Sequence, residues 1–130
     1  DLISEKHIIL RRSVEERWAE LEEEDISHTE ALLLAKINMG KISIAEVARQ
    51  ANISRQAMFK CAKKLEMRGY LKFVVNESNN KYTELTDKGK DYCKKSTELK
   101  EQMEREIAEV LGKDKVEALK DLLSRDWSIK

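Results

Sequence analysis

Residues 43–71 read SIAEVARQANISRQAMFKCAKKLEMRGYL, and the spacing of their small and apolar residues predicts a helix-turn-helix. Ala48 is small where the two helices of such a unit cross closely. Asn52 lies in the turn between them, where the backbone needs a positive φ; glycine suits such a position best and asparagine comes next. The second helix then turns its polar face away from the first. Its apolar residues on the inner side are Ile53, Met58 and Cys61.

The composition favours a single helical domain over residues 1–130. The chain has no proline and only four glycines, and residue types that propagate helices are abundant. A chain of this length removes about two-thirds of its unfolded surface from water, which is enough for one hydrophobic core. There is no run of about 18 apolar residues and no signal-peptide pattern at the N-terminus, so we expect a cytoplasmic protein without a membrane span.

Capping signals and apolar periodicity predict four helices before Gly69. A stripe at steps of three, four and seven predicts a first helix over 2–24. The S-x-x-E pattern of a capping box begins at Ser27 and again at Ser43, so helices are expected to start there. Ser54 is expected to cap the fourth helix. Its predicted buried face consists of Met58, Cys61, Ala62 and Leu65.

After Gly69 the apolar period changes to two, which predicts a β-hairpin. Leu71, Phe73 and Val75 would share one face of the first strand, and the second strand is expected over 81–85. A long helix should follow from Asp87 to Gly112. A pattern resembling a capping box, formed by Asp114 and Glu117, predicts the start of the last helix. The expected fold class is mainly α with a small β-hairpin, that is, a winged helix-turn-helix.

Charge is unevenly distributed although the net charge is zero. Residues 1–30 carry four Lys/Arg and ten Asp/Glu, a net charge of −6, whereas residues 31–83 carry ten and three, a net charge of +7. Residues 84–130 carry eleven and twelve, a net charge of −1. Such charge can simply solvate a helical surface, but here the basic excess coincides with the helix-turn-helix. This coincidence favours a phosphate-binding face.

The segment ISIAEVARQANISRQAMFKCAKKLEMRGYL (42–71), followed by ELTDKGKDY (84–92), resembles the MarR family of bacterial winged-helix transcription regulators. The resemblance implies a DNA-binding core over 27–86 and dimerisation helices over 1–24 and 87–130. It also implies a homodimer that binds a pseudo-palindromic operator in double-stranded DNA. Members mostly repress transcription and are often released by a small-molecule effector or by thiol oxidation, so a repressor with such an effector is the expectation.

Helical spacing and the resemblance together select the candidate DNA contacts. Arg55 offers a bidentate donor to guanine and Gln56 can pair with adenine, while Lys60 can reach a base or a phosphate. Ser54 marks a helix N-terminus, whose N–H groups attract phosphate. Phe59 has two interpretations: it contacts thymine methyl groups, or it packs back against the core or the wing. The residues expected to position the protein on phosphates are Lys63, Lys64 and Arg68.

The wing departs from the family pattern. In the family an Asp-x-Arg element sends its arginine into the minor groove, and the matching places in this chain hold Glu77 and Asn79. Asparagine has no cationic head for a narrow minor groove. Lys81 is near, but out of register. We therefore expect either that the wing, through Asn79 and Lys81, contacts the DNA backbone weakly, or that the protein binds DNA less tightly than its relatives.

The long apolar stripes of the terminal helices favour a homodimer, because such stripes need a partner surface. Trp18 and Trp127 lie in the segments expected at that interface. A two-fold interface would place two recognition helices about 34 Å apart, one turn of DNA. The alternative is that these stripes pack on the chain's own winged helix.

No residue pattern points to catalysis, a cofactor or a metal, so the protein is not expected to be an enzyme. His7 and His28 lack the spacing of metal ligands. Cys61 is expected to be buried and inert. Cys93 precedes two lysines that could lower its pKa, but neither cysteine matches the first-helix cysteine of the peroxide-sensing members, so thiol sensing stays a minor alternative.

A second class of function also stays open, namely a winged helix used as a protein–protein adaptor or anti-repressor. The zero net charge and the altered wing favour it, whereas the basic recognition face favours DNA. A steep salt dependence of DNA binding would separate the two, because phosphate contacts release counterions.

Overall fold

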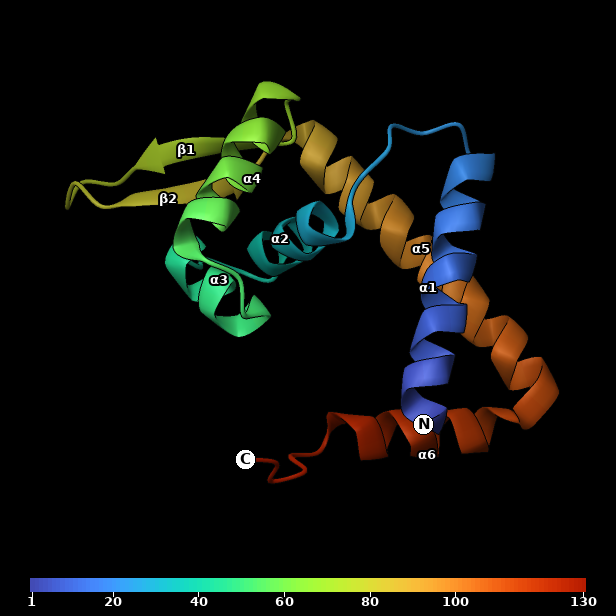
Figure 1. Ribbon diagram of the computed structural model, residues 1–130. Helices are drawn as coiled ribbons and strands as arrows, with labels where there is room; N and C mark the ends of the chain where they lie inside the picture. The colour runs from blue at the N-terminus through green and yellow to red at the C-terminus, as the bar shows by residue number, and fades with distance from the viewer. The chain divides into compact units, whose positions relative to one another are not determined.

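Six helices and a two-stranded hairpin make up the computed structural model, which describes residues 1–130 (Figure 1). Their order is the one predicted from the sequence, so the mainly α class with a small β-hairpin wing is confirmed. No helix combines the length and apolarity that a membrane crossing requires. The elements are α1 (Leu2–Glu20), α2 (His28–Asn38), α3 (Ile44–Ala51), α4 (Arg55–Met67), β1 (Leu71–Val75), β2 (Lys81–Leu85), α5 (Asp87–Leu111) and α6 (Lys113–Ser124).

The chain folds into two compact units. We call residues 18–95 the winged unit and residues 1–17 with 96–130 the terminal unit. The winged unit contains α2, α3, α4, the hairpin, the end of α1 and the start of α5, and so extends beyond the predicted core of 27–86 at both ends. Trp18 packs within this unit, with its ring centroid 5.1 Å from that of Tyr92. Its place at a dimer interface stays a prediction.

Serine caps begin the helices of the winged unit where the sequence predicted them. Ser27 Oγ accepts the N–H of Glu30 at 3.1 Å, and the Glu30 carboxylate accepts the N–H of Ser27 at 2.9 Å, which completes a capping box. Ser54 Oγ accepts the N–H of Ala57 at 3.1 Å. Each cap satisfies a donor that the helix itself leaves without a partner.

The start of α3 follows the prediction only in part, whereas its end follows it fully. Ser43 Oγ accepts the N–H of Glu46 at 3.0 Å, but the Glu46 carboxylate binds Arg49 and Gln50 instead of returning to Ser43. The predicted second capping box is therefore only half formed. Asn52 follows α3 with φ 55° and ψ 45°, the left-handed geometry expected at the turn.

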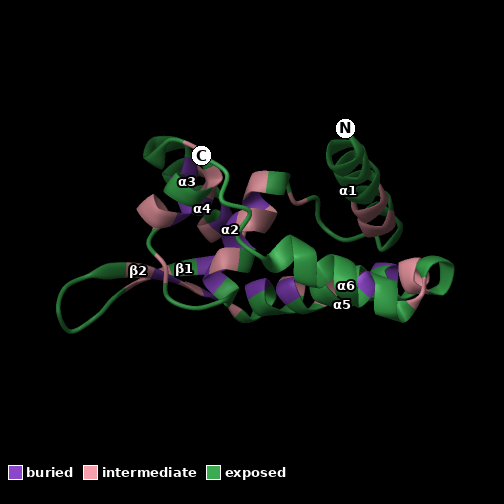
Figure 2. Ribbon diagram, turned by 90° about the horizontal axis from the view of Figure 1, so that it is seen from below, coloured by how far each residue is buried: buried purple, intermediate pink, exposed green.

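A single hydrophobic core lies where α2, α3, α4 and the base of the hairpin meet (Figure 2). Cys61 was predicted to belong to its buried part but is only half-buried and packs at its edge, although burial still raises the pKa of its thiol. The core is formed by Leu33, Leu34, Ile37, Val47, Ala48, Met58, Ala62, Leu65, Tyr70, Leu71, Leu85 and Cys93.

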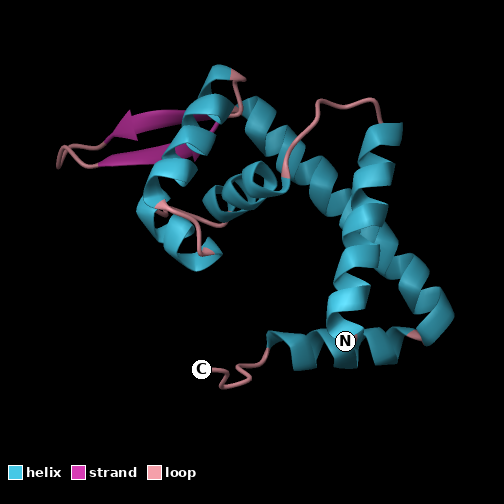
Figure 3. Ribbon diagram, in the orientation of Figure 1, coloured by secondary structure: helices cyan, strands magenta, loops and turns pink.

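The wing is an antiparallel hairpin in which Leu71 pairs with Leu85 and Phe73 with Thr83 (Figure 3). At its base Leu71 and Leu85 are buried, which anchors the hairpin in the core. Val75 was predicted on the same half-buried face but is 52 % exposed, because the outer part of the hairpin extends beyond the core. The wing is therefore fixed at its base and solvated toward its tip.

Helix α1 ends at Glu20, earlier than the predicted end at residue 24. Glu22 has a positive φ of 55°, so the helix cannot continue through it. The next two residues turn toward lysines of α5: Glu23 pairs with Lys95 at 2.7 Å, and Glu24 pairs with Lys88 at 2.9 Å. These ion pairs form between residues far apart in the sequence, so helical periodicity gave no sign of them.

The start of α6 corrects another prediction. The helix begins at Lys113, with Gly112 as its N-cap at φ 104° and no side-chain capping bond. Asp114 therefore lies inside the helix, and its predicted role as a cap is wrong. A glycine N-cap suits the positive φ at the break after α5, whereas an aspartate there would be strained.

The terminal unit buries few of its large apolar side chains. Only Met103 and Val116 are buried in it. An amphipathic helix normally covers its apolar face, so this unit leaves an unusual area of apolar surface in contact with water. The exposed residues are Leu2, Ile3, Ile8, Ile9, Leu10, Val110, Leu111, Leu119, Leu122, Leu123, Trp127 and Ile129.

Candidate nucleic-acid interface

Helix α4 carries most of the residues predicted to contact DNA. Met58, Ala62 and Leu65 are 0 % exposed and fix one side of the helix in the core. The 3.6-residue period then places Gln56 and Lys60 on the opposite side, where both are exposed. The buried stripe therefore orients a polar and cationic face toward solvent, as the sequence predicted.

The N-terminal end of α4 is accessible as well. Ser54, Arg55 and Gln56 are all exposed, and the Ser54 cap leaves further N–H groups of the first turn without a partner inside the helix. The helix dipole adds partial positive charge at this end. The Arg55 and Gln56 side chains thus start from the point of α4 that is best suited to approach a polyanion.

The sequence left two interpretations of Phe59, contact with DNA or packing against the core or the wing, and the structure combines features of both. Its ring centroid is 5.9 Å from that of Phe73 on the wing, yet the residue remains 47 % exposed. Lys63 lies over the same pair, with its ammonium 4.4 Å from the Phe73 centroid and 3.5 Å from a Glu66 carboxylate oxygen. The Phe59 ring therefore packs against the wing without being covered by it.

Lys64 and Arg68 differ in what surrounds them. Lys64 is exposed. The Arg68 guanidinium is 2.9 Å from a Glu30 carboxylate oxygen and donates to the backbone oxygen of Asp25 at 2.7 Å. It also lies 3.4 Å from the Glu24 carboxylate. A phosphate would have to displace these partners, so the structure gives Arg68 an internal role that joins the end of α4 to the segment before α2.

The wing tip presents Asn79 and Lys81, both exposed. Asn79 has φ 60°, and its N–H donates to the backbone oxygen of Asn76 at 3.0 Å. The turn geometry by itself accounts for an asparagine at this position. Lys81 begins β2 opposite Val75. Farther down the hairpin Lys72 lies 3.8 Å from Glu84, so part of the wing's positive charge is balanced within it.

Comparison with known proteins agrees with this geometry. Residues 26–83 match the model of the MarR family. The winged helix-turn-helix of this chain is thus similar to that of the MarR family. No curated protein matches the chain.

Solved structures of similar fold include transcription regulators. The chain is similar to MepR, a transcription regulator of the Staphylococcus aureus multidrug efflux pump MepA, with 15 % identity and a TM-score of 0.75 over 95 % of this chain and 91 % of MepR. A MarR-family protein of Mycobacterium tuberculosis in complex with p-aminosalicylic acid is 23 % identical, with a TM-score of 0.72 over 94 % of this chain and 92 % of that protein. A transcriptional regulator of Thermotoga maritima is 21 % identical, with a TM-score of 0.67 over 94 % of this chain and 86 % of that protein. These likenesses establish the fold.

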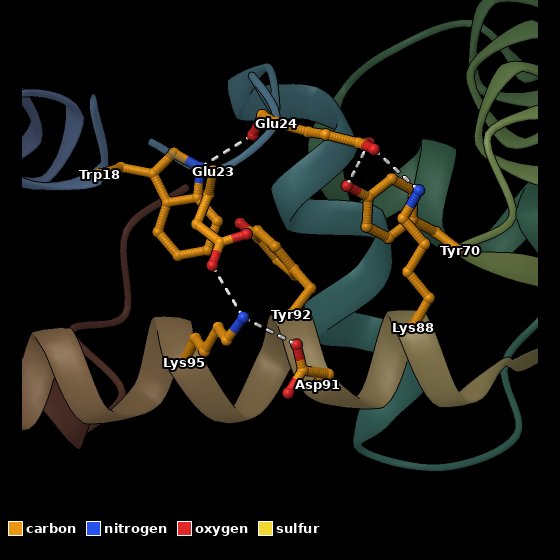
Figure 4. Close-up of a pocket in the computed structure, with 8 residues that line it drawn as sticks. All are labelled: Trp18, Glu23, Glu24, Tyr70, Lys88, Asp91, Tyr92 and Lys95. Carbon is orange, nitrogen blue, oxygen red and sulfur yellow. Dashed lines mark hydrogen bonds and ion pairs between the residues drawn. The ribbon is translucent and has the colours of Figure 1, made fainter. Parts of the chain in front are cut away.

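A small cavity of about 130 Å³ lies within the winged unit (Figure 4). The Tyr70 ring lies 6.2 Å from that of Tyr92, which in turn meets Trp18. Lys95 is paired with both Glu23 and Asp91, which raises the pKa of its ammonium. The lining comprises Trp18, Glu23, Glu24, Tyr70, Lys88, Asp91, Tyr92 and Lys95.

Glu24 accepts hydrogen bonds from two other residues that line this cavity (Figure 4). It accepts the Tyr70 hydroxyl at 2.6 Å and the Lys88 ammonium at 2.9 Å, and these bonds lower the pKa of Glu24 from 4.5 to about 2. Burial and the bond to Glu24 raise the pKa of Tyr70 to about 12. Because Glu24 also approaches Arg68, the cavity is joined to the end of α4. The sequence did not predict this lining, since its residues come from three distant segments.

Proposed function

We propose that this protein is a transcription regulator that binds double-stranded DNA sequence-specifically through α4. The observation that carries the proposal is the exposed cationic face of α4, held outward by Met58, Ala62 and Leu65, which are 0 % exposed. The basic excess falls on the same winged helix, since residues 31–83 carry a net charge of +7. An α-helix of this kind fits the major groove of B-DNA.

Four exposed polar residues of α4 have a role in this proposal. Arg55 and Gln56 read base edges, because both side chains can form bidentate hydrogen bonds. Lys60 and Lys64 bind phosphates, and the first turn behind Ser54 offers its N–H groups to another. Arg68 is left out, because Glu30 and Asp25 already hold it. Asn79 and Lys81 make weak backbone contacts at the wing.

The protein acts as a homodimer in this proposal. The terminal unit exposes many large apolar residues, among them Leu119, Leu122 and Leu123, each about half exposed. A second copy of the chain would cover them, as two-fold interfaces are self-complementary. The two copies of α4 would then meet a pseudo-palindromic operator at half-sites about 34 Å apart. Sedimentation at micromolar concentration tests this, and a monomer would contradict it.

We further propose that the protein represses transcription in the cytoplasm and that a small aromatic molecule releases it from DNA. A similar M. tuberculosis protein has been crystallised with p-aminosalicylic acid. In this chain the cavity lined by Trp18, Tyr70 and Tyr92 is the candidate effector site. A ligand that separated Glu24 from Tyr70 and Lys88 would also disturb the contact between Glu24 and Arg68 at the end of α4.

Fluorescence of Trp18 tests the effector site, with Trp127→Phe as background so that only Trp18 reports. Salicylate is the probe. We expect it to quench Trp18 and to weaken operator binding over the same concentration range, and Tyr92→Ala should reduce both responses. Quenching without any change in DNA binding would contradict the coupling.

Selection from random duplex DNA, followed by anisotropy titrations, tests the main proposal. We expect Arg55→Ala to reduce affinity and to relax base preference, since a bidentate contact is worth about 1–3 kcal/mol of discrimination. Lys60→Ala should flatten the dependence of log K on log salt by about 0.9, which is the slope that one neutralised phosphate contributes. Lys115→Ala, an exposed lysine of the terminal unit, is the matched control and should leave both unchanged.

The competing hypothesis, that the protein is a protein–protein adaptor, predicts the opposite result for DNA binding. An adaptor would bind duplex DNA weakly or not at all and would show little salt dependence. If the purified protein selects no duplex even at low ionic strength, the regulator proposal fails.

A further inference from the structure

Phe59 and Phe73 join α4 to the wing. Their ring centroids are 5.9 Å apart with 58° between the planes, a tilted arrangement that aromatic pairs favour. We propose that Phe59, Phe73 and Lys63 form a positioning cluster that sets the angle between α4 and the wing. The effect on DNA rests on the proposed function, whereas the cluster itself can be tested without DNA.

The place of Phe73 in the hairpin makes this contact important. On its face of β1, Leu71 is 1 % exposed and Val75 is 52 % exposed, so Phe73 is at the boundary between core and solvent. Thr83, directly opposite, is 4 % exposed and belongs to the fixed base. The hairpin beyond Phe73 is held mainly by its own strand pairing, so a contact at Phe73 controls the direction in which the tip points.

Lys63 strengthens the pair from the solvent side. Its ammonium is 4.4 Å from the Phe73 centroid and 5.5 Å from the Phe59 centroid, within the range of cation–π attraction. The Glu66 carboxylate, 3.5 Å away, holds the same ammonium from α4. Lys63 therefore bridges helix and wing, so its predicted role as a phosphate contact competes with these attractions.

A small change of angle matters because the wing is a lever. From Phe73 to the tip the strand runs about four residues, or roughly 13 Å at the usual strand rise, so a rotation of about 10° moves the tip by roughly 2 Å. A hydrogen bond to a phosphate does not survive such a displacement. On the other face of the hairpin Lys41 lies 4.9 Å from the Tyr82 centroid, so removing the Phe59 ring should reduce the wing's contact with DNA without abolishing it.

Two measurements on the full chain test the cluster. The first is a double-mutant cycle of Phe59→Ala and Phe73→Ala in urea unfolding, for which an aromatic pair predicts a coupling factor of about 2 to 10 in the unfolding constant. The second is hydroxyl-radical footprinting on the selected operator. Phe59→Ala should lose protection at the flanks, where the wing lies, and keep protection at the centre of each half-site. Affinity should fall about two- to tenfold.

Matched variants make the outcomes decisive. Phe59→Leu, which keeps an apolar contact, should restore part of the flank protection, and Val75→Ala, on the same face but exposed, should change nothing. An uncoupled unfolding cycle, or unchanged flank protection in Phe59→Ala, overturns the proposal. So does a change of base preference in Phe59→Ala that Phe73→Ala does not share, because Phe59 would then read a base. If the parent chain binds no duplex, the regulator function fails while the unfolding cycle still decides about the cluster.

Discussion

Replacing Gly89 by alanine should have two opposing effects on the free energy of unfolding, and the size of each is known. Gly89 is in the first turn of α5, where alanine would ordinarily stabilise a helix by about 0.8–1.0 kcal/mol relative to glycine. A β-carbon at Gly89, however, would lie 2.1 Å from the backbone oxygen of Tyr70 and 3.2 Å from Leu85 Cδ2. Carbon–oxygen contacts are normally about 3.3 Å or longer, so the overlap exceeds roughly 1 Å.

The overlap cannot be relieved by rotating a side chain, because the atom it meets is backbone. Tyr70 is 4 % exposed, its oxygen accepts the N–H of Thr86 at 3.1 Å, and its hydroxyl is bound by Glu24. Overpacking of a well-packed site costs about 1–3 kcal/mol and occasionally more, and an overlap this large with a backbone atom belongs at the upper end, about 3 kcal/mol. The gain of about 1 kcal/mol in helix propensity offsets part of this cost, so we expect Gly89→Ala to be destabilised by about 2 kcal/mol.

Urea unfolding followed by circular dichroism measures this loss. With a slope of about 2 kcal/mol per molar urea, the midpoint should fall by about 1 M. Lys90→Ala is the control, since the neighbouring side chain is exposed and should move the midpoint little. A midpoint for Gly89→Ala equal to or above that of the parent chain would show that helix propensity outweighs the contact, and the reasoning would be refuted.

Three further predictions follow from single positions. Asn52→Ala should lose about 1–2 kcal/mol of unfolding free energy because φ is 55°, whereas Asn52→Gly should stay close to the parent in the same urea titration. Leu34→Ala, at a position that is 0 % exposed, should lose about 2–5 kcal/mol, and a loss below about 1 kcal/mol would mean that the core is not packed there as described. The pKa of Glu24 is lowered from 4.5 to about 2, so its contribution to stability is complete above pH 4.5 and is lost as the pH falls toward 2; Glu24→Gln should remove that part of the acid loss, and an unchanged acid limb contradicts it.

Local signals predicted the winged unit well. The serines at 27, 43 and 54 begin helices because their hydroxyls accept an N–H three residues ahead, and this arrangement is visible in the sequence. Asn52 adopts its left-handed geometry for an equally local reason. The two errors at helix ends, after Glu20 and before Asp114, arose where a positive φ ended or began the helix.

The candidate DNA-binding site could likewise be predicted only where local signals determine it. The outward face of α4 follows from the period of its buried residues. The surroundings of Arg68 do not, since its partner Glu30 is 38 residues earlier in the chain. Nor could the sequence show that Phe59 would meet Phe73, or that Glu24 would meet Tyr70 and Lys88.

The sequence by itself determined the helices, the turn, the hairpin and the side of α4 that faces solvent, because each depends on hydrogen bonds and apolar spacing within a few residues. Only the tertiary structure decided which of the charged and aromatic side chains remain available to a partner. Arg68 is held by a carboxylate, Phe59 rests on the wing, and Lys60 stays exposed. Ion pairs and ring contacts between distant segments depend on the distance between folded elements, and sequence spacing carries no measure of that distance.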